Sequence, residues 1–124
     1  MPREAIQPDG LARPKPPYSP VVVSGEHVFT AGQIANDADG NLVGDGIEEQ
    51  TRQVLENLRI CLEAAGSSLD EVVKVTAFLA DLGDFPGYNR VYAEFFSEPY
   101  PARSSIGVAL PPGVLVEIEA VARR

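Results

Sequence analysis

The 124-residue sequence predicts an α+β domain in which two helices cover one face of a sheet of about five or six strands. Two segments repeat apolar residues at three- and four-residue steps, as amphipathic helices do. Other runs are rich in β-branched residues or alternate in hydropathy, as strands do. Along the chain the order is hairpin, helix, strand, helix, strand, strand. The length fits one domain, which at this size can bury a modest core without a disulfide or a structural metal.

Prolines dominate the first part of the chain. Pro2, Pro8, Pro14, Pro16 and Pro17 precede the first strand signal, with Pro20 at the boundary. Because proline lacks a backbone N–H and restricts the residue before it, this segment cannot be a helix. We expect residues 1–17 to form an extended N-terminal arm lying across the domain, and residues 18–124 to form the single domain.

A hairpin and a long turn follow the arm. Val21–Val23 and His27–Thr30 flank Ser24–Glu26, the composition of two strands with a short loop. The segment 36–41 then consists of turn-forming residues. Its acidic residues do not make a calcium loop, because Ala35 and Gly46 would occupy the first and twelfth ligand positions.

The segment 47–65 predicts the first helix. Its apolar positions are Ile47, Val54, Leu55, Leu58, Cys61, Leu62 and Ala65. Asp45 and Glu48 resemble a capping box, and Gly66 is a natural stop. Cys61 lies on the apolar stripe, which favours a buried cysteine over a reactive thiol.

The second half of the chain predicts a strand, a helix and two further strands. Residues 72–80 alternate as a strand, and an aromatic-rich stripe after the turn at 81–84 predicts a core-facing helix. That stripe comprises Phe85, Tyr88, Val91, Tyr92, Phe95 and Phe96. The runs 102–110 and 114–121 read as strands joined by Pro111–Gly113.

The last strand predicts an uncovered sheet face. Val114, Val116, Ile118 and Ala120 alternate with Leu115, Glu117, Glu119 and Val121, which gives one apolar side and one mixed side. Two helices can cover only one face of the sheet. We therefore expect oligomerisation through the other face, which would create clefts between subunits.

Composition excludes several classes of function. The net charge is −8 and the basic residues do not cluster, which disfavours nucleic-acid binding. No apolar run approaches the length of a membrane span, and the N-terminus lacks the apolar core of a signal peptide, so we expect a cytoplasmic protein. One cysteine and one histidine, His27, exclude disulfides and most metal sites, and the glycines fit no nucleotide-binding fingerprint. We expect no cofactor.

Arg103 and Glu117 are the residues most suited to chemistry. Arg103 begins a predicted core strand, where a cation needs a partner; that partner is either a bound carboxylate or a surface acid. Glu117 and Glu119 point the same way from one strand, so either could orient a water or shuttle a proton if enclosed. Pairing Ala109 with Val114 would put Arg103 and Glu117 on opposite faces, whereas a one-residue slip would bring them together. The sequence leaves that register open.

Five sequence blocks together resemble the Rid (YjgF) family, the reactive intermediate imine deaminases. They are PYSP at 17–20, VFTAGQI at 28–34, QTRQVLENL at 50–58, PARS at 101–104 and VEIEA at 116–120. The resemblance runs from about Tyr18 to the C-terminus with the blocks in order. It implies a chorismate-mutase-like fold and a homotrimer with three sites between subunits. The implied activity is cofactor-free hydrolysis of 2-imino acids, such as 2-iminobutanoate and 2-iminopropanoate, to 2-keto acids and ammonia.

The resemblance also implies roles for individual residues. Arg103 corresponds to the arginine that grips the substrate carboxylate, and Glu117 to the glutamate that holds the attacking water. The remaining implied contacts are Tyr18 as the flanking aromatic, Ala31 and Gly32 as backbone beside the imine, Asn89 at the edge, and Ser105 as backbone facing the carboxylate.

The chain departs from common family members at several positions. Ala31 replaces a serine and Ser105 a cysteine, Gly107 lies where an acidic residue is common, Pro17 replaces glycine or alanine, and the stretch before Leu110 is one residue shorter. These changes alter the polarity of the implied pocket and so could shift the preferred imine. The alternative hypothesis is a non-catalytic carboxylate-binding or chaperone-like trimer. Ribonuclease or chorismate mutase activity fits poorly with the charge and the single confident arginine.

Overall fold

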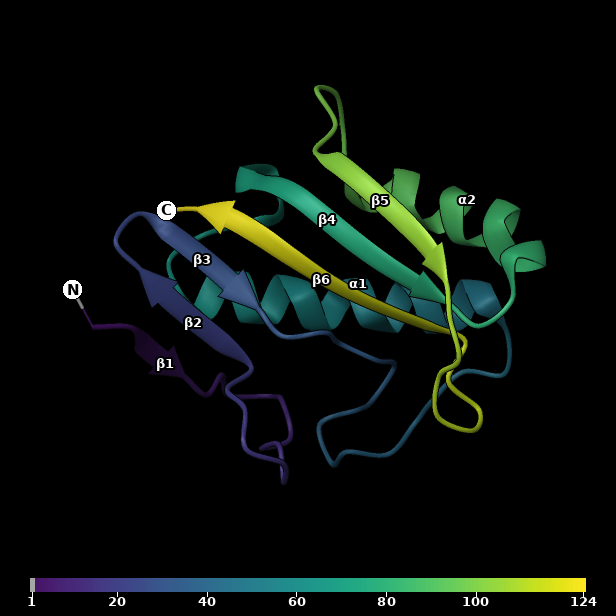
Figure 1. Cartoon of the computed structure of the whole chain (residues 1–124), viewed down its shortest axis with the longest axis horizontal. Coiled ribbons are helices and arrows are strands. Elements are labelled where there is room, and N and C mark those ends of the chain that lie inside the picture. Colours follow the sequence, from purple (N-terminus) through teal and green to yellow (C-terminus); the bar gives the residue numbers. More distant parts are fainter. Residues whose placement is uncertain (1) are drawn as a thin grey trace.

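A computed structural model describes residues 2–124 as one six-stranded sheet with two helices on one side (Figure 1). The strands are β1 (Glu4–Ile6), β2 (Val21–Ser24), β3 (His27–Thr30), β4 (Val72–Leu79), β5 (Ala102–Gly107) and β6 (Val116–Arg123). The helices are α1 (Ile47–Ala64) and α2 (Phe85–Phe95). A short 3-10 turn at Leu69–Glu71 precedes β4, and another at Leu82–Asp84 precedes α2. The predicted α+β class and the order of elements are confirmed.

Strand order in the sheet corrects one expectation. The order is β1-β2-β3-β6-β4-β5, so β4 lies between the last two strands of the chain. The strands at 102–107 and 116–123 are therefore not a hairpin. Helix α2 connects β4 to β5 as a crossover, which makes that pair parallel, while every other pairing is antiparallel.

Part of the proline-rich arm joins the sheet. β1 pairs antiparallel with β2, from Glu4 opposite Val23 to Ile6 opposite Val21. Pro8 follows two residues after the strand, where its missing N–H does not interrupt the ladder. The arm then crosses back as irregular chain to Pro20, which is buried.

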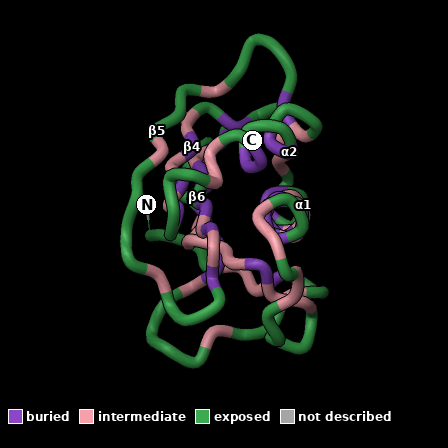
Figure 2. The backbone as a smooth tube through the Cα atoms, turned by 90° about the vertical axis from the view of Figure 1, so that its right-hand side faces the viewer, coloured by how far each residue is buried: buried purple, intermediate pink, exposed green. Residues whose placement is uncertain are grey.

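Both helices pack on the same face of the sheet. Figure 2 shows the strands β4, β5 and β6 on one side and the helices α1 and α2 on the other. Residues of α1 and alternate residues of the strands meet there in one apolar core. Its fully buried members include Val28, Leu55, Leu58, Leu62, Val75, Leu79 and Ile118. Cys61 belongs to this core, and burial raises the pKa of its thiol to about 12, as expected for an inert side chain.

Glycines mark the start and the stop of α1. The predicted capping box is wrong: the helix begins after Gly46, whose extended backbone provides no side-chain cap. Gly66 follows the helix with a φ of +78°, a conformation that glycine adopts without strain. The Ser67 N–H then donates to the Leu62 carbonyl at 2.8 Å, so the helix ends where the sequence indicates.

Within residues 2–124, the opposite face of the sheet carries no helix. Across it, Val22 lies opposite Phe29 and Phe29 opposite Val121, which makes an apolar row over three strands. Phe29 is 43% exposed. We call this the open face and the helix-bearing side the covered face.

Among residues 2–124, no helix is long and apolar enough to cross a membrane.

Candidate functional site

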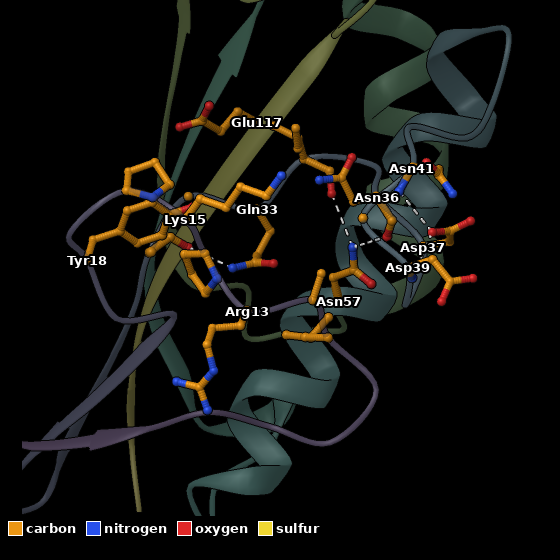
Figure 3. Close-up of a pocket in the computed structure, with 18 of the residues that line it drawn as sticks. Arg13, Lys15, Tyr18, Gln33, Asn36, Asp37, Asp39, Asn41, Asn57 and Glu117 are labelled. Carbon is orange, nitrogen blue, oxygen red and sulfur yellow. Dashed lines mark hydrogen bonds between the residues drawn. The ribbon is translucent and has the colours of Figure 1, made fainter.

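A cavity of about 930 Å³ lies at the edge of the sheet beneath the N-terminal arm (Figure 3). It is formed by the arm, the loop between β3 and α1, the start of β6, and single residues of α1 and of the loop before β6. The lining includes the predicted site residues Tyr18, Ala31, Gly32 and Glu117, together with Arg13, Lys15, Gln33, Asn36, Asp37, Asp39 and Asn57. The structure thus brings together four of the seven predicted site residues.

Glu117 is the titratable group that faces both the cavity and the open face. It lies on β6 opposite Phe78 of β4, and it is half-buried. Burial raises the pKa of the Glu117 carboxyl, and the neighbouring negative charge of Glu119 raises it further. Glu119 points the same way but is exposed. A carboxyl with a raised pKa is suited to accept and return a proton.

Gly32 permits the close approach of Glu117 to the loop backbone. A Cβ at position 32 would overlap the Glu117 carboxylate, so a larger residue could not occupy this position without displacing it. The Gln33 N–H donates to the Ile118 carbonyl at 2.8 Å, and the Ile118 N–H donates back to Gln33 at 3.0 Å. This pair of bonds keeps the Ala31–Gln33 backbone beside β6.

Asn57 anchors the far side of the loop and was missed at the sequence level. This α1 residue is 2% exposed, and its side-chain amide donates to the carbonyls of Ile34 and Asn36 at 3.1 and 2.9 Å. The available signal was its place on the apolar side of the helix, three residues from Val54 and four from Cys61. A buried amide there requires partners, and the loop carbonyls supply them.

The arm contributes Tyr18 and two cations to the cavity. Tyr18 is 53% exposed at the cavity mouth. Figure 3 shows Lys15 and Tyr18 on the arm side of the cavity, with Asn36, Asp37 and Asp39 on the opposite side. The sequence interpretation did not select Arg13 or Lys15, since neither belongs to a motif.

Arg103 does not reach this cavity. It lies on the edge strand β5 opposite Val75, which points to the covered face, whereas Glu117 points to the open face. Its guanidinium lies over three aromatic rings of α2, with Cζ 4.7 Å from the ring centroid of Tyr92. The sequence did not settle whether Arg103 and Glu117 share a face of the sheet. In the structure they lie on opposite faces.

The other two predicted residues also lie outside the cavity. Ser105 is two residues from Arg103 on β5, and its hydroxyl lies 3.3 Å from that of Tyr88. Asn89 is exposed on α2. The candidate site is thus divided within one chain into a Glu117 half and an Arg103 half.

No group of three or more histidine, cysteine or acidic side chains in residues 2–124 is arranged to hold a metal ion.

The fold and the divided site define a class of small α+β proteins with a one-sided sheet, and comparison with known proteins identifies it. The family model described as Endoribonuclease L-PSP matches residues 11–124. A RutC family protein of Pyrococcus horikoshii is 48% identical over 122 residues, covering 97% of both chains. The chain therefore belongs to this family, the Rid (YjgF) family, as its motifs predict.

Solved structures agree with this assignment. RidA from the Antarctic bacterium Psychrobacter is 41% identical and superimposes with a TM-score of 0.92 over 98% of this chain and 99% of its own. TdcF of Escherichia coli, whose crystal structure contains bound serine, is 40% identical with a TM-score of 0.90 over 98% of each chain. The family and the six-stranded fold are thus confirmed together.

Proposed function

We propose that the protein is a cofactor-independent hydrolase that converts small 2-imino acids, of the 2-iminobutanoate and 2-iminopropanoate type, to 2-keto acids and ammonia. The observation that carries the proposal is the Glu117 carboxyl, half-buried in the cavity against Gly32 with a raised pKa, in a chain of the Rid family. Arg103 supplies the second requirement, a cation for the substrate carboxylate.

The chemistry requires only orientation and one proton carrier. The Glu117 carboxylate accepts a proton from water as the water oxygen bonds to the imine carbon. That proton passes to the imine nitrogen, which gives a carbinolamine with a hydroxyl and an amino group on one carbon. The hydroxyl proton then moves through the same carboxylate to the nitrogen, so the C–N bond breaks, the C=O bond forms, ammonia leaves and the 2-keto acid remains. Arg103 binds the carboxylate through its planar N–H donors and fixes the carbon in front of the water. Ala31 and Gly32 present backbone next to the imine, and Tyr18 flanks it.

Two copies of the chain are needed to complete this site. Arg103 and Glu117 lie on opposite faces of one sheet, so a single molecule cannot hold one substrate between them. The open face carries the apolar row of Val22, Phe29 and Val121, which association would bury. A homotrimer with the open faces inside would set the Glu117 half of one subunit beside the Arg103 half of the next, with Ser105 and Asn89 at that border. This assembly remains part of the proposal.

The serine bound in the TdcF structure supports the substrate class. Serine carries a carboxylate and a nitrogen on one carbon, as a 2-imino acid does. The same observation favours a second candidate function, a trimeric module that binds small carboxylates without turning them over. No membrane or nucleic-acid partner is proposed, and the cytoplasmic location stays a prediction.

The test generates imines in situ with an amino-acid oxidase or a dehydratase and follows keto-acid formation with and without the protein. We expect Arg103→Ala and Glu117→Gln each to lower the rate at least 100-fold, which is about 2.7 kcal/mol of transition-state stabilisation. Arg90→Ala is the matched control, because Arg90 pairs with Glu48 on the surface at 3.1 Å, away from the cavity. Its rate should match that of the unmodified protein.

Mixing the two inactive variants tests the shared site. After co-refolding, some sites would contain Arg103 from one copy and Glu117 from another, so activity should return. An absence of activity in the mixture would contradict the shared site. If calorimetry shows binding of 2-oxobutanoate but no imine is turned over, the hydrolase proposal is wrong and the carboxylate-binding module is favoured.

A further inference from the structure

Arg103 is held differently from the four arginines that form ion pairs within residues 2–124. Arg52, Arg59, Arg90 and Arg123 each form an ion pair with a glutamate on the surface. Within residues 2–124, Arg103 has no carboxylate within ion-pairing distance. Its Cζ instead lies 5.8, 5.1 and 4.7 Å from the ring centroids of Phe85, Tyr88 and Tyr92.

The rings form one continuous column along α2. Phe85, Tyr88 and Tyr92 are spaced by three and four residues, so they share one side of the helix. Phe85 and Tyr88 meet edge to face at 5.7 Å, Tyr88 and Tyr92 also lie 5.7 Å apart, and Tyr92 stacks on Phe96 at 4.6 Å. Tyr88, Tyr92 and Phe96 are buried. The three rings beneath Arg103 are therefore packed against one another along α2, and Phe96 continues the row beyond them.

Stacking on rings leaves the donors of a guanidinium free. The attraction between cation and ring acts on the flat face of the guanidinium, while its five N–H groups lie in the plane. A glutamate partner would instead occupy the same fork that a substrate carboxylate needs. The ring column thus orients Arg103 without competing for its ligand.

A second contact ties β5 to the same helix. The Tyr88 hydroxyl lies 3.3 Å from the Ser105 hydroxyl, two residues along the strand from Arg103. Burial raises the pKa of Tyr88, against the opposing effects of Ser105 and Arg103, so the hydroxyl stays protonated and can donate. The edge strand is thereby fixed to α2 next to the arginine.

We propose that Tyr92 and Tyr88 are positioning residues, which hold the Arg103 guanidinium over the α2 rings with its N–H fork open to the carboxylate of the substrate. This inference rests on the proposed function, since it assigns the role of Arg103 in carboxylate binding. Tyr92 acts through its ring alone, because its buried hydroxyl has no hydrogen-bond partner within residues 2–124.

The test measures the Kd of 2-oxobutanoate by calorimetry and, separately, KM and kcat for the imine. We expect Tyr92→Leu to raise Kd and KM about tenfold, with kcat changed less than twofold, because the reacting groups are untouched. Tyr92→Phe keeps the ring and should restore unmodified values. Tyr88→Phe, which removes the hydroxyl that contacts Ser105 and also interacts with Arg103, should raise Kd about threefold.

Phe96→Leu is the matched control for Tyr92→Leu. It removes a buried ring from the same column, but that ring is not one of the three beneath Arg103. It should lower thermal stability while leaving Kd unchanged. If Tyr92→Leu does not fold, Phe85→Leu replaces it, because Phe85 is only half-buried; a threefold rise in Kd is expected there.

The outcomes separate this inference from the proposed function. Unchanged Kd in Arg103→Ala would refute the carboxylate contact itself. Weakened binding in Arg103→Ala, with equal Kd in Tyr92→Leu and Phe96→Leu, would refute the positioning role and leave the proposed function standing. If the Kd values change as predicted but no imine is turned over, the positioning role is supported and the hydrolase proposal is refuted.

Discussion

The two faces of the sheet, built from alternate residues of the same strands, differ in what their side chains do. On the covered face, Val75, Ile118 and Ala120 are buried against the helices. On the open face, Thr76, Glu117 and Glu119 alternate with them and stay partly or fully exposed. One face provides stability, and the other carries the group suited to chemistry and the surface suited to association.

Arg103 shows where this division breaks down. It points to the covered side, but it lies on the edge strand, where the helix layer ends. A cation can therefore lie on aromatic rings and still be exposed. Each chain then presents the two candidate residues separately, Arg103 at the edge of the covered face and Glu117 on the open face. An edge strand can thus pack on the core and, in the proposed assembly, also face a neighbouring subunit.

The largest effect should come from a charge on the covered face. Ile118 is fully buried on β6, and an aspartate there would be an unpaired charge in the core. We expect Ile118→Asp to lose about 4 kcal/mol or more of unfolding free energy and to be recovered unfolded or aggregated. Circular dichroism and urea unfolding provide the measurement.

Phe29→Asp is the corresponding change on the open face. Phe29 is 43% exposed, so the single chain should stay folded by circular dichroism. If the open faces associate as proposed, its mass in analytical ultracentrifugation should fall from about three chains to the 13.3 kDa of one. Loss of folding in Phe29→Asp, or an unchanged mass, would contradict the contrast between the two faces.

A smaller and more specific effect is expected at Gly32. A Cβ there would overlap the Glu117 carboxylate, so Gly32→Ala should displace the proposed water-binding group. We expect kcat to fall roughly tenfold or more, which corresponds to a barrier higher by about 1.4 kcal/mol. Thermal stability should change little. Gly46→Ala is the control, because nothing lies within 4 Å of a Cβ at that position. Equal kcat in both variants would show that the closeness of Gly32 to Glu117 has no catalytic consequence.

The smallest effect should be the pH dependence of stability at Glu117. The pKa of Glu117 in the folded state is raised above its ordinary value of 4.5. Between the ordinary and the raised pKa, the folded state therefore binds more protons than the unfolded state. Stability from this group is therefore present at low pH and lost above the raised pKa. Glu117→Gln removes this loss.

Urea unfolding between pH 3.5 and 8 measures this difference. The unfolding free energy of Glu117→Gln minus that of the unmodified protein should increase as pH increases. Glu26→Gln changes an exposed residue in the hairpin turn and is the control. Its unfolding free energy should change with pH in the same way as that of the unmodified protein. A constant offset for Glu117→Gln across the range would mean that the Glu117 environment does not disfavour its charge.

Local patterns predicted most of the fold. The apolar spacing of 47–65 and the aromatic spacing of 85–96 indicated α1 and α2 to within one or two residues, because a helix repeats over a few neighbouring positions. The alternation at 114–121 correctly separated the faces of β6. The hairpin of β2 and β3 is confirmed, because its two strands are neighbours in the chain. The pairing of the last two strands was wrong, since it depends on which distant segments meet.

The site residues likewise divide into those that sequence motifs predicted and those that only the folded chain brings together. Motifs selected seven residues, and four of them line the cavity. The seven are Tyr18, Ala31, Gly32, Asn89, Arg103, Ser105 and Glu117. Asn57 and Lys15 were missed because their roles come from segments far apart in the chain that meet only after folding. The contact of Arg103 with the α2 rings was also missed, because the aromatic stripe was interpreted only as part of the core.

The sequence by itself determined the element types, the two-sided character of β6 and the family, because these depend on short-range spacing and on residue identity. Only the tertiary structure decided that β4 lies between β5 and β6, and therefore that Arg103 and Glu117 face opposite ways. The physical reason is that strand order and register arise from long-range packing of a crossover helix against the sheet, which no local period encodes.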